Sequence, residues 1–342
     1  MPDVKDCSDG YVAPPRTGPN PFEEVDINVQ AKLPQGSKVV KISSYGSSFW
    51  TQTAQLEIKL PNDTTKSYFL KVAEGENGRG MMEGEFASMS LLYSITPDFV
   101  PKPHAWGTYK SLPQFHFFLC DFHNMTEELP EIESFTSSVA RLHKASMPLS
   151  PGRYGFHLPT HMGFTAQDNS WCDTWEDFFR QGMVRMLERE RNVHGPSEEL
   201  DELCKQLYDK VIPRLLRPLT VLKSITPVLV HGDLWYGNCC TDNDTGKPIV
   251  FDACVFWSHN EYEVGTWRAL RYRFGKSYIK AYQKHFPISE PEEDYDDRNA
   301  LYSIAMNTMK WLIKKYPKGY EEWEEEYRVS HEGEAATAAT EA

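Results

Sequence analysis

The residues with the clearest chemical potential lie in the segment His-Gly-Asp-Leu-Trp-Tyr-Gly-Asn, which runs from His231 to Asn238. Asp233 and Asn238 stand five residues apart, and Asp252 follows the next short apolar run. In enzymes that transfer a phosphoryl group from ATP, an Asp and an Asn with this spacing share one loop, and a later Asp follows a hairpin. The order therefore predicts Asp233 as the catalytic base and Asn238 and Asp252 as magnesium ligands.

The alternative is that these are ordinary turn residues and that His231 is a buried, hydrogen-bonded histidine. The pattern His-x-Asp-x₄-Asn alone arises by chance in on the order of a few per cent of chains of this length. Its surroundings favour the catalytic interpretation, because the apolar runs Val228–Val230 and Ile249–Phe251 predict a strand pair around a hairpin at 242–247. The third motif reads Asp-Ala-Cys instead of Asp-Phe-Gly, which favours metabolite kinases over protein kinases.

A charged pair is predicted upstream of this loop. Lys71 lies within an apolar strand pattern, where a buried ammonium group needs a partner or a ligand. In the helix that follows, Glu85 shares an otherwise apolar face with Met89 and Leu92, whereas Glu83 falls on another side. We therefore expect Lys71 and Glu85 to pair and to position the phosphates of ATP. The alternative is a lysine that extends to solvent and a solvated glutamate.

Two further segments are weaker candidates for ATP binding. Gly46 and Ser47 lie between two predicted strands, where backbone N–H groups and a hydroxyl could contact phosphate, but an ordinary hairpin turn explains them equally. Asp121 and Phe122 follow a predicted strand at the point where strand patterns give way to helix patterns. A kinase hinge would bind adenine there, and a plain connection between two lobes is the alternative.

The elements that must position these residues indicate an α+β, bilobal, protein-kinase-like fold. Residues 21–121 read as a small β-rich lobe with one main helix that binds ATP, and residues 122–330 read as a large, mostly helical lobe with the catalytic loop and acceptor site. Residues 1–20 are expected to be flexible, and residues 331–342 disordered. The predicted strands cover 38–44, 50–60, 67–73 and 114–120, and the predicted helices 79–94, 132–145, 173–191, 197–216, 263–285 and 298–316.

Composition limits the classes of partner and compartment. The 342 residues are 40% hydrophobic, enough for a full core, and the net charge of −13 disfavours nucleic acids and anionic lipid surfaces as partners. The seven cysteines form no Cys-x-x-Cys motif and are odd in number, which argues against a disulfide framework or a zinc site. With no signal-peptide pattern and no long apolar run, we expect a cytoplasmic protein that does not cross a membrane.

The sequence resembles the fructosamine kinase, or ketosamine-3-kinase, family from about Lys38 to Tyr316. The resemblance is carried by His-Gly-Asp-Leu-Trp, by Val-Phe-Asp-Ala at Asp252, and by Ser-His-Asn-Glu-Tyr-Glu, which ends at Glu263. Further matching segments are Phe-Leu-Lys-Val, Met-Glu-Gly-Glu-Phe-Ala-Ser, Tyr-Gly-Phe-His and Asn-Ser-Trp. The resemblance implies a protein-kinase-like fold that uses ATP and Mg²⁺. It also implies phosphorylation at O3 of a fructosamine or ribulosamine on lysine, which promotes loss of the sugar and so repairs glycated proteins.

The sequence departs from the family pattern at two positions, and these departures bear on which sugar acceptor is used more than on the binding of the nucleotide. Ala253 stands where the family reads Pro, and Trp257 precedes Ser where the family tends to read Tyr-Gly. Trp235 is the first candidate for contact with the sugar, with anchoring of the loop as an equal alternative. His259 and Glu261 are further candidates for contact with the substrate, and a structural role is the alternative for both.

Two rival functions remain open at this point. The first is a kinase of the same fold with another acceptor, such as an aminoglycoside or an amino alcohol. The second is a nucleotide-binding pseudokinase or interaction module. Partners under the main hypothesis are small ketosamines or glycated proteins; the sequence leaves open which of these is the natural acceptor, and leaves the oligomeric state unknown.

Overall fold

The computed structural model describes residues 19–46, 48, 50–126, 128–269, 272–303 and 306–329. The expectations for most of residues 1–20, for residues 331–342 and for Ser47 therefore lie outside the described residues.

The N-terminal lobe is a five-stranded antiparallel sheet with one long helix against it. Alternate residues of the second strand, Ala54, Leu56 and Ile58, are buried on one face, as expected for a half-covered sheet. The strand order is β1-β2-β3-β5-β4. The elements are α1 (Ile27–Gln30), β1 (Lys38–Ser44), β2 (Gln52–Lys59), β3 (Thr65–Glu74), α2 (Gly75–Ile95), β4 (Pro103–Thr108) and β5 (Phe115–Asp121).

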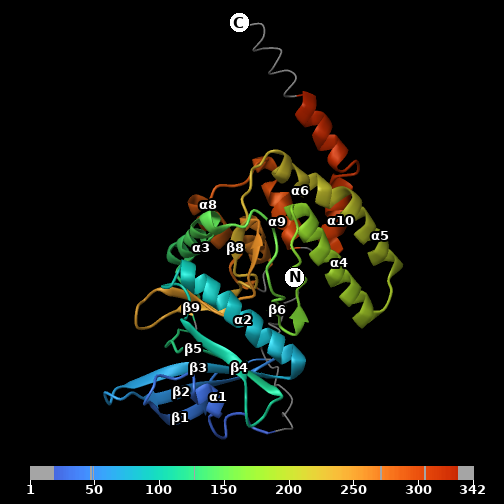
Figure 1. Ribbon diagram of the computed structural model, residues 1–342. Helices are drawn as coiled ribbons and strands as arrows, with labels where there is room; N and C mark the ends of the chain where they lie inside the picture. Colours follow the sequence, from blue (N-terminus) through green and yellow to red (C-terminus); the bar gives the residue numbers. More distant parts are fainter. Residues whose placement is uncertain are drawn as a thin grey trace.

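The C-terminal lobe is mostly helical, and Figure 1 shows it above the sheet with α2 between the two parts. Its α-helices include α3 (Ile132–Ser146), α4 (Trp175–His194), α5 (Glu198–Gln206), α6 (Ile212–Val221), α7 (Asn260–Gly265), α8 (Gly275–His285), α9 (Tyr295–Tyr302) and α10 (Met306–Lys315). Residues 320–329 are also helical. A π-helical turn at Leu207–Val211 joins α5 to α6. Short 3₁₀ turns cover Met147–Leu149, Tyr236–Asn238, Thr266–Arg268 and Glu292–Asp294.

Three two-stranded ribbons in this lobe carry the loops that face the sheet. β6 (His161–Met162) pairs with β7 (Thr165–Ala166). The other strands are β8 (Val228–Val230), β9 (Cys239–Thr241), β10 (Pro248–Val250) and β11 (Phe256–Ser258). The prediction that the apolar runs of β8 and β10 form one strand pair is wrong, because β8 pairs with β11 and β10 pairs with β9.

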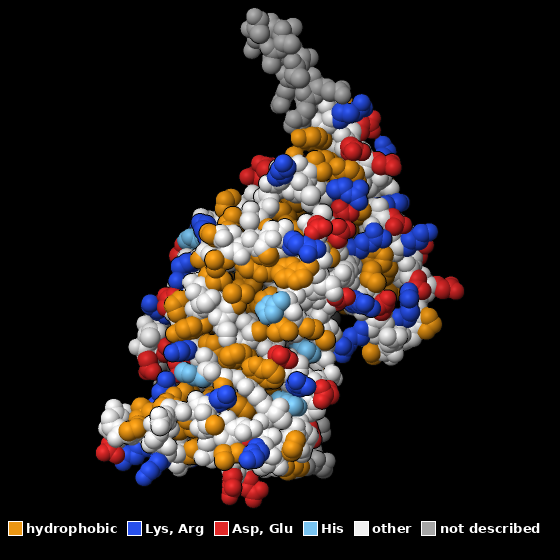
Figure 2. All heavy atoms as spheres, viewed as in Figure 1, with side chains coloured by type: hydrophobic (Ala, Val, Ile, Leu, Met, Phe, Trp, Pro, Cys, Tyr) orange, Lys and Arg blue, Asp and Glu red, His pale blue; other side chains and the backbone are white. Residues whose placement is uncertain are grey.

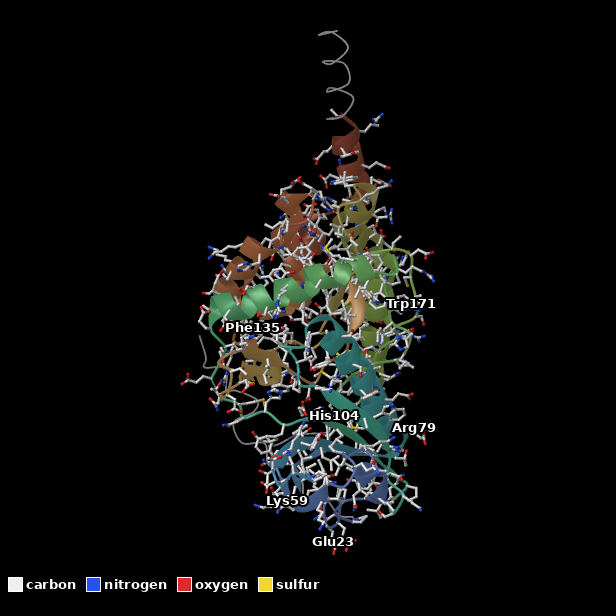
Figure 3. The ribbon with its side chains drawn as sticks, turned by 60° about the vertical axis from the view of Figure 1, so that its left-hand side comes forward. Glu23, Lys59, Arg79, His104, Phe135 and Trp171 are labelled. Atoms are coloured by element: carbon white, nitrogen blue, oxygen red, sulfur yellow. The ribbon has the colours of Figure 1, made fainter. Side chains whose placement is uncertain are left out.

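The two lobes share a hydrophobic core. Met82 and Leu92 of α2 belong to the same buried cluster as Phe135 of α3 and Val230 of β8. Figure 3 shows α2 between the sheet that carries Lys59 and the helix α3 that carries Phe135. A separate cluster covers the other face of the sheet. The helix α2 is therefore packed against both lobes and fixes the inner face of the sheet relative to the helical lobe.

Three predicted helices differ from the structure, and one strand was not predicted. The helix expected over 298–316 is divided into α9 and α10, with a turn at Ser303. The helix expected over 263–285 is broken after Arg268, and the helix expected over 197–216 has the π-helical turn within it. The strand β4 was not predicted, since its mixed sequence Pro-His-Ala-Trp-Gly-Thr lacks a clear alternation of apolar and polar residues. It is an edge strand, where a proline and polar residues are tolerated.

Candidate active site

A cavity of about 450 Å³ lies between the lobes and gathers most of the residues that the sequence singled out. Lys71 and Glu85 come to it from β3 and α2 of the small lobe. Asp233, Asn238 and Asp252 come to it from the loops that follow β8 and β10. Five residues from four separate segments therefore face one space, which is the arrangement that phosphoryl transfer from ATP requires.

A buried lysine joins the small lobe to the loop after β10. Lys71 Nζ lies 2.8 Å from Glu85 Oε2 and 2.9 Å from Asp252 Oδ1, so the expected ion pair with Glu85 is present. Burial raises the pKa of Glu85 to about 8, although Lys71 opposes the shift. Burial acts in the same direction on Asp252, but the charge of Lys71 outweighs it and lowers the pKa of Asp252. Asp252 is thus the carboxylate that stays charged near neutral pH, and its side chain is 41% exposed to the cleft.

The loop after β8 brings Asp233 and Asn238 together. Asn238 Nδ2 donates hydrogen bonds to the backbone oxygen of Asp233 at 2.9 Å and to its Oδ2 at 3.1 Å. These bonds use the nitrogen of the Asn238 amide and leave its Oδ1 as the atom able to bind a cation. Burial raises the pKa of Asp233 to about 6, and the nearby charge of Asp252 adds to the shift. A carboxylate with this pKa can accept a proton from a hydroxyl near neutral pH.

Sequence reasoning did not give Glu263 a role, although it ends one of the family-like motifs. Its carboxylate accepts hydrogen bonds from the backbone N–H of His231 and, at 3.3 Å, from that of Gly232. His231 is fully buried, donates from Nε2 to the Phe251 oxygen at 2.9 Å, and accepts from the Asp233 N–H at 3.4 Å. These contacts fix the backbone at His231 and Gly232, just before Asp233, and link it to the backbone at Phe251, just before Asp252. No local spacing predicts them, because Glu263 is about thirty residues from the groups it binds.

Backbone geometry also fixes the two loops against each other. Gly232 has φ +86°, and a Cβ there would lie 2.4 Å from the Cys254 oxygen, so only glycine fits without displacement. The Cys254 N–H in turn donates to the His231 oxygen at 2.9 Å. Asp252 has φ +60°, a conformation that costs a non-glycine residue about 1–2 kcal/mol. The strain is offset by surrounding contacts, which hold Asp252 toward Lys71.

Of the other residues predicted to contact the nucleotide, Gly46, Asp121 and Phe122 line the cleft. Gly46 has φ +72° and lies in the β1–β2 connection above the cavity, while the adjacent Ser47 lies outside the described residues. Phe122 lines the cavity and packs edge-on against Tyr45, with ring centroids 4.8 Å apart. Asp121 also lines the cavity, but its side chain pairs with Lys66 and His104 instead of pointing to a ligand. Any contact of Asp121 with adenine would therefore come from its backbone.

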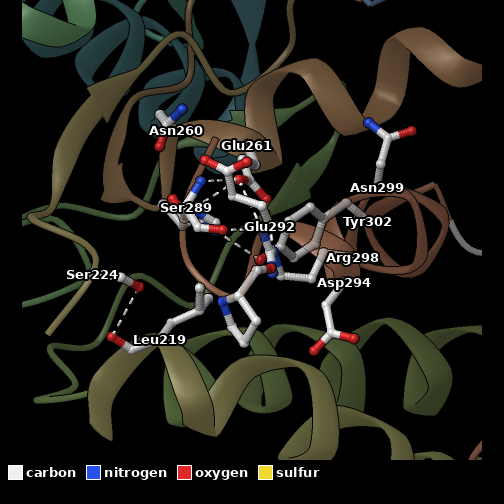
Figure 4. Close-up of polar contacts among 12 residues, drawn as sticks. Leu219, Ser224, Asn260, Glu261, Ser289, Glu292, Asp294, Arg298, Asn299 and Tyr302 are labelled. Atoms are coloured by element: carbon white, nitrogen blue, oxygen red, sulfur yellow. Dashed lines mark hydrogen bonds and ion pairs between the residues drawn. The ribbon is translucent and has the colours of Figure 1, made fainter. Parts of the chain in front are cut away.

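Of the three residues predicted to contact the sugar, only Trp235 lines the cleft. His259 is fully buried and bonds Tyr302 Oη and Ser289 Oγ, each at 2.9 Å. Glu261 is also buried and forms an ion pair with Arg298, with Nε 2.8 Å from Oε2. Figure 4 shows the part of this network in which Glu261 bonds Arg298 and the Ser289 backbone N–H. The structure favours the structural alternative for His259 and Glu261 and corrects their prediction as substrate contacts.

A short hairpin of the helical lobe, β6–β7, closes one end of the cleft. His161 and Gly163 line the cavity, and the ring of Phe164 packs edge-on against Trp50 at 4.7 Å. A Cβ added at Gly163 would lie 2.8 Å from Trp50 Nε1. Because Trp50 belongs to the connection between β1 and β2, the hairpin touches the segment that covers the cleft from the other lobe. We refer to this contact, Trp50 with Gly163 and Phe164, as the interlobe clasp.

Comparison with known proteins decides the family. The fructosamine kinase family profile matches residues 28–325, which is most of the chain. The chain belongs to the fructosamine kinase family. Among curated relatives, a protein named protein-ribulosamine 3-kinase, chloroplastic, from rice (Oryza sativa subsp. indica) is 30% identical over 241 residues, which cover 70% of this chain. The same match covers 65% of the rice protein's own length, just under two thirds. Mouse ketosamine-3-kinase is 29% identical over 270 residues, or 73% of this chain and 84% of that protein.

Solved structures confirm the fold of this fructosamine kinase family member. A candidate fructosamine-3-kinase from Thermobifida fusca aligns with a TM-score of 0.61 at 19% identity, and covers 82% of this chain and 95% of that one. A candidate fructosamine-3-kinase from Haemophilus somnus gives a TM-score of 0.59 at 20% identity, with 80% and 86% covered. At these identities the structures establish the bilobal, protein-kinase-like α+β fold that the sequence predicted.

Proposed function

We propose that the protein transfers the γ-phosphoryl group of ATP to O3 of a ketosamine, a fructosamine or ribulosamine carried on a lysine amine. One observation carries the proposal: a buried Lys71–Glu85–Asp252 cluster and a hydrogen-bonded Asp233–Asn238 pair face the same cleft. Membership of the fructosamine kinase family supports the choice of a sugar amine as acceptor.

The side chains of the cleft divide the work of transfer between them. Lys71, held by Glu85, can bind the α- and β-phosphates of ATP, and Asp233 can orient the acceptor hydroxyl and take up its proton. The bond between O3 and the γ-phosphorus forms while the bond from that phosphorus to the β-phosphate bridging oxygen breaks, and ADP leaves. The rate enhancement comes mainly from positioning and from stabilisation of negative charge, with no covalent enzyme intermediate.

The donor set in the cleft fits Mg²⁺. Hard cations prefer oxygen ligands, and Mg²⁺ uses few protein oxygens and keeps phosphate and water as its others. Asn238 offers Oδ1, since its nitrogen is occupied by Asp233, and Asp252 offers a partly exposed carboxylate with a lowered pKa. Mg²⁺, when bound, would neutralise charge on the phosphates. We assign Asn238 and Asp252 to hold it.

The same proposal predicts what becomes of the phosphorylated product and in which compartment the protein acts. Loss of a proton from C1 would let the phosphate at O3 leave as inorganic phosphate, and water would then hydrolyse the resulting C1–N imine, so that the lysine amine is restored and the sugar departs as a deoxy dicarbonyl. No described helix is long and apolar enough to cross a membrane. All six cysteines in the described part of the chain are free thiols, which supports a reducing compartment, and we propose the cytoplasm.

The proposal is tested with synthetic fructosyl-lysine and ribulosyl-lysine, ATP and Mg²⁺. We expect ADP release with both or one of them, and a ³¹P NMR signal of a sugar 3-phosphate. Asp233→Asn should lower turnover by about 10²–10⁴-fold and still bind Mg·ATP. A panel with an aminoglycoside and an amino alcohol separates the rivals: turnover only with those would reject the ketosamine assignment. ATP binding without turnover of any acceptor would instead favour a nucleotide-binding module.

A further inference from the structure

A closed loop of the helical lobe, residues 154–172, lies against the chain that follows Asp252. Its two ends are joined by a pair of backbone hydrogen bonds between Tyr154 and Cys172, each 2.9 Å long. Its hairpin β6–β7 lies against helix α2, where a Cβ added at Gly80 would be 2.8 Å from His161 Cε1 (Figure 1). Two of the family-like motifs, Tyr-Gly-Phe-His and Asn-Ser-Trp, belong to this segment, and the proposed reaction gives them no part. We call the segment the 154–172 loop.

Cys254 and Val255, two and three residues after Asp252, are hydrogen-bonded to three different parts of the protein. The Cys254 N–H donates to the His231 oxygen of the catalytic loop at 2.9 Å, and the Val255 N–H donates to Ser88 Oγ of α2 at 3.2 Å. The third partner is the 154–172 loop, which donates two hydrogen bonds to the Cys254 oxygen. The backbone just beyond Asp252 is therefore fixed relative to the catalytic loop, to α2 and to the 154–172 loop.

Thr160 makes the main contact from the 154–172 loop. Its hydroxyl donates to the Cys254 oxygen at 3.3 Å and accepts from Asn169 Nδ2 at 2.7 Å and from Gln167 Nε2 at 3.2 Å. Gln167 Nε2 also donates to the Cys254 oxygen at 3.3 Å. A hydroxyl has one hydrogen to donate and two lone pairs to accept, so the hydrogen-bonding capacity of Thr160 is fully used. Valine would fill the same space but would take an acceptor from the amides of both Asn169 and Gln167.

This hydrogen-bond network is neutral and closed to solvent. Thr160 and Ser88 are fully buried, and Asn169 is 4% exposed. On the face drawn in Figure 2, charged side chains of both signs are spread over the surface, but the network itself contains none. Hydrogen bonds are stronger where water is excluded, and a buried donor without a partner is costly. The network is therefore suited to hold the backbone at Cys254 in one position.

Asp252 depends on such support because its own backbone conformation is strained. Its φ of +60° lies in a region that residues with a Cβ seldom adopt. Lys71 Nζ attracts its side chain at 2.9 Å, but Lys71 also pairs with Glu85 and contacts no backbone atom of Asp252 in these ion pairs. A strained residue persists where the surrounding structure over-determines its conformation. The three contacts at Cys254 and Val255 supply that constraint within three residues of Asp252.

We propose that Thr160, together with Gln167 and Asn169, positions Asp252 to bind Mg²⁺. None of the three lines the cleft, so they act through the backbone at Cys254 and are positioning residues. Without the Thr160 hydroxyl, the Cys254 oxygen loses a donor and Asp252 can leave its strained conformation, so its carboxylate turns away from the phosphates. This inference rests on the assignment of Asp252 to Mg²⁺ in the proposed function, and adds the residues that determine its geometry.

The test measures binding, so it does not depend on which acceptor the enzyme uses. Calorimetry gives the affinity for the non-hydrolysable ATP analogue AMP-PNP in Mg²⁺ and in EDTA, and the ratio of the two is the contribution of the metal. Thr160→Val removes the hydroxyl at nearly constant volume, and Thr160→Ser keeps it. The matched control is Thr136→Val in α3, because Thr136 is equally buried and its hydroxyl donates to the Ile132 oxygen at 2.8 Å.

We expect Thr160→Val to lower the ratio about tenfold and to leave the affinity in EDTA unchanged. Thr160→Ser and Thr136→Val should keep the wild-type ratio. If Thr160→Val lowers both affinities by the same factor, or if Thr136→Val lowers the ratio as much, the network supports only the fold and the inference is wrong. Gln167→Met, a milder change at a half-buried residue, covers the case in which thermal denaturation shows that Thr160→Val does not fold. It removes one donor to the Cys254 oxygen and should lower the ratio about two- to threefold.

Further outcomes separate the inference from the activity on which it rests. A wild-type ratio near one would remove Asp252 as a Mg²⁺ ligand, and the inference with it. If wild type and variants show the expected ratios but wild type phosphorylates no ketosamine, the proposed reaction fails and the positioning of Asp252 stands.

Discussion

Asp233 and Asp252 are carboxylates on neighbouring loops that face the same cleft, but their surroundings move their pKa values in opposite directions. Burial raises the pKa of Asp233 to about 6, whereas Lys71 overcomes burial at Asp252 and lowers its pKa. One carboxylate is thereby suited to take up a proton and the other to stay charged beside the phosphates. The buried charge of Asp233 is a cost to stability that serves the proposed reaction.

Replacing Asp233 with the isosteric asparagine separates activity from stability. Asp233→Asn should lower kcat by about 10²–10⁴-fold, because the proton acceptor is lost. The folded-state pKa lies above that of the unfolded chain, so the ionised group destabilises the fold as pH rises from about 4 to about 6. The variant should therefore gain about 3 kcal/mol at pH 7 and nothing below pH 4. Urea denaturation at the two pH values checks this, and an equal gain at both would contradict it.

A prediction for His259 concerns only the pH dependence of stability, and here stability is lost as the pH falls. Burial lowers its pKa to about 4, against an ordinary value of 6.5, so the unfolded chain takes up a proton more readily than the folded protein. Stability should therefore fall by about 3 kcal/mol between pH 6.5 and pH 4 from this residue. His259→Gln keeps a polar side chain that cannot titrate, and its melting temperature should depend less on pH over this range. An unchanged pH dependence would mean that His259 is not the neutral histidine of the network.

At the scale of elements, helix α7 fixes the loop that carries Asp233. Glu263 in this helix accepts the backbone N–H groups of His231 and Gly232, and so orders the chain just before Asp233. In the helix α2, Ser88 Oγ accepts the Val255 N–H at 3.2 Å, which ties the small lobe to the chain beyond Asp252. Both contacts act on backbone groups, so they position the reacting side chains without touching a ligand.

Glu263→Gln tests the positioning role. The amide keeps one oxygen acceptor in place of two, so one of the backbone N–H groups loses its partner. We expect kcat to fall at least about tenfold while KM for ATP changes little, since the lysine cluster is separate. Steady-state kinetics gives the split, and thermal denaturation shows whether the fold is retained. A loss confined to KM for ATP would argue against this role.

The sequence predicted the helices and strands better than it predicted the contacts between them. Apolar periodicity identified the strand of Lys71 and the helix of Glu85, and two charges on buried faces implied their contact, which the structure contains. Their role in ATP binding stays a proposal. The role of Glu263 and the pairing of β8 with β11 depend on contacts between residues about thirty positions apart, and nothing in a local pattern encodes them. The same holds for His259 and Glu261, whose polar character gave no sign that Ser289 and Arg298 would bury them.

At the scale of the whole molecule, the lobes are joined by a packed core at α2 and by the interlobe clasp at the opposite side of the cleft. The core is large and apolar, which favours a fixed relation between α2 and the helical lobe. The clasp is small, and its rings are partly exposed, with Trp50 at 47% and Phe164 at 41%. The covering segment around Gly46 is held by this clasp on one side and by Tyr45 on the other, whose ring packs against Phe69 and Phe122.

Two glycine variants test the clasp with matched backbone strain. Gly163→Ala adds a Cβ 2.8 Å from Trp50 Nε1 at φ +57°, so either the hairpin or the covering segment must move. Gly152→Ala adds a Cβ at φ +71° with nothing within 4 Å, and so carries the strain of a positive φ without the collision. We expect Gly163→Ala alone to raise KM for ATP about three- to tenfold, with similar losses of stability in both variants. Equal KM values would show that the clasp does not position the covering segment.

The β6–β7 hairpin is a partition with a different surface on each side. His161 and Gly163 line the cleft on one side, whereas Met162 and Thr165 line a second cavity on the other. A substitution at Met162 therefore alters the lining of one cavity and leaves the lining residues of the other in place, so the two surfaces of this hairpin can be changed independently.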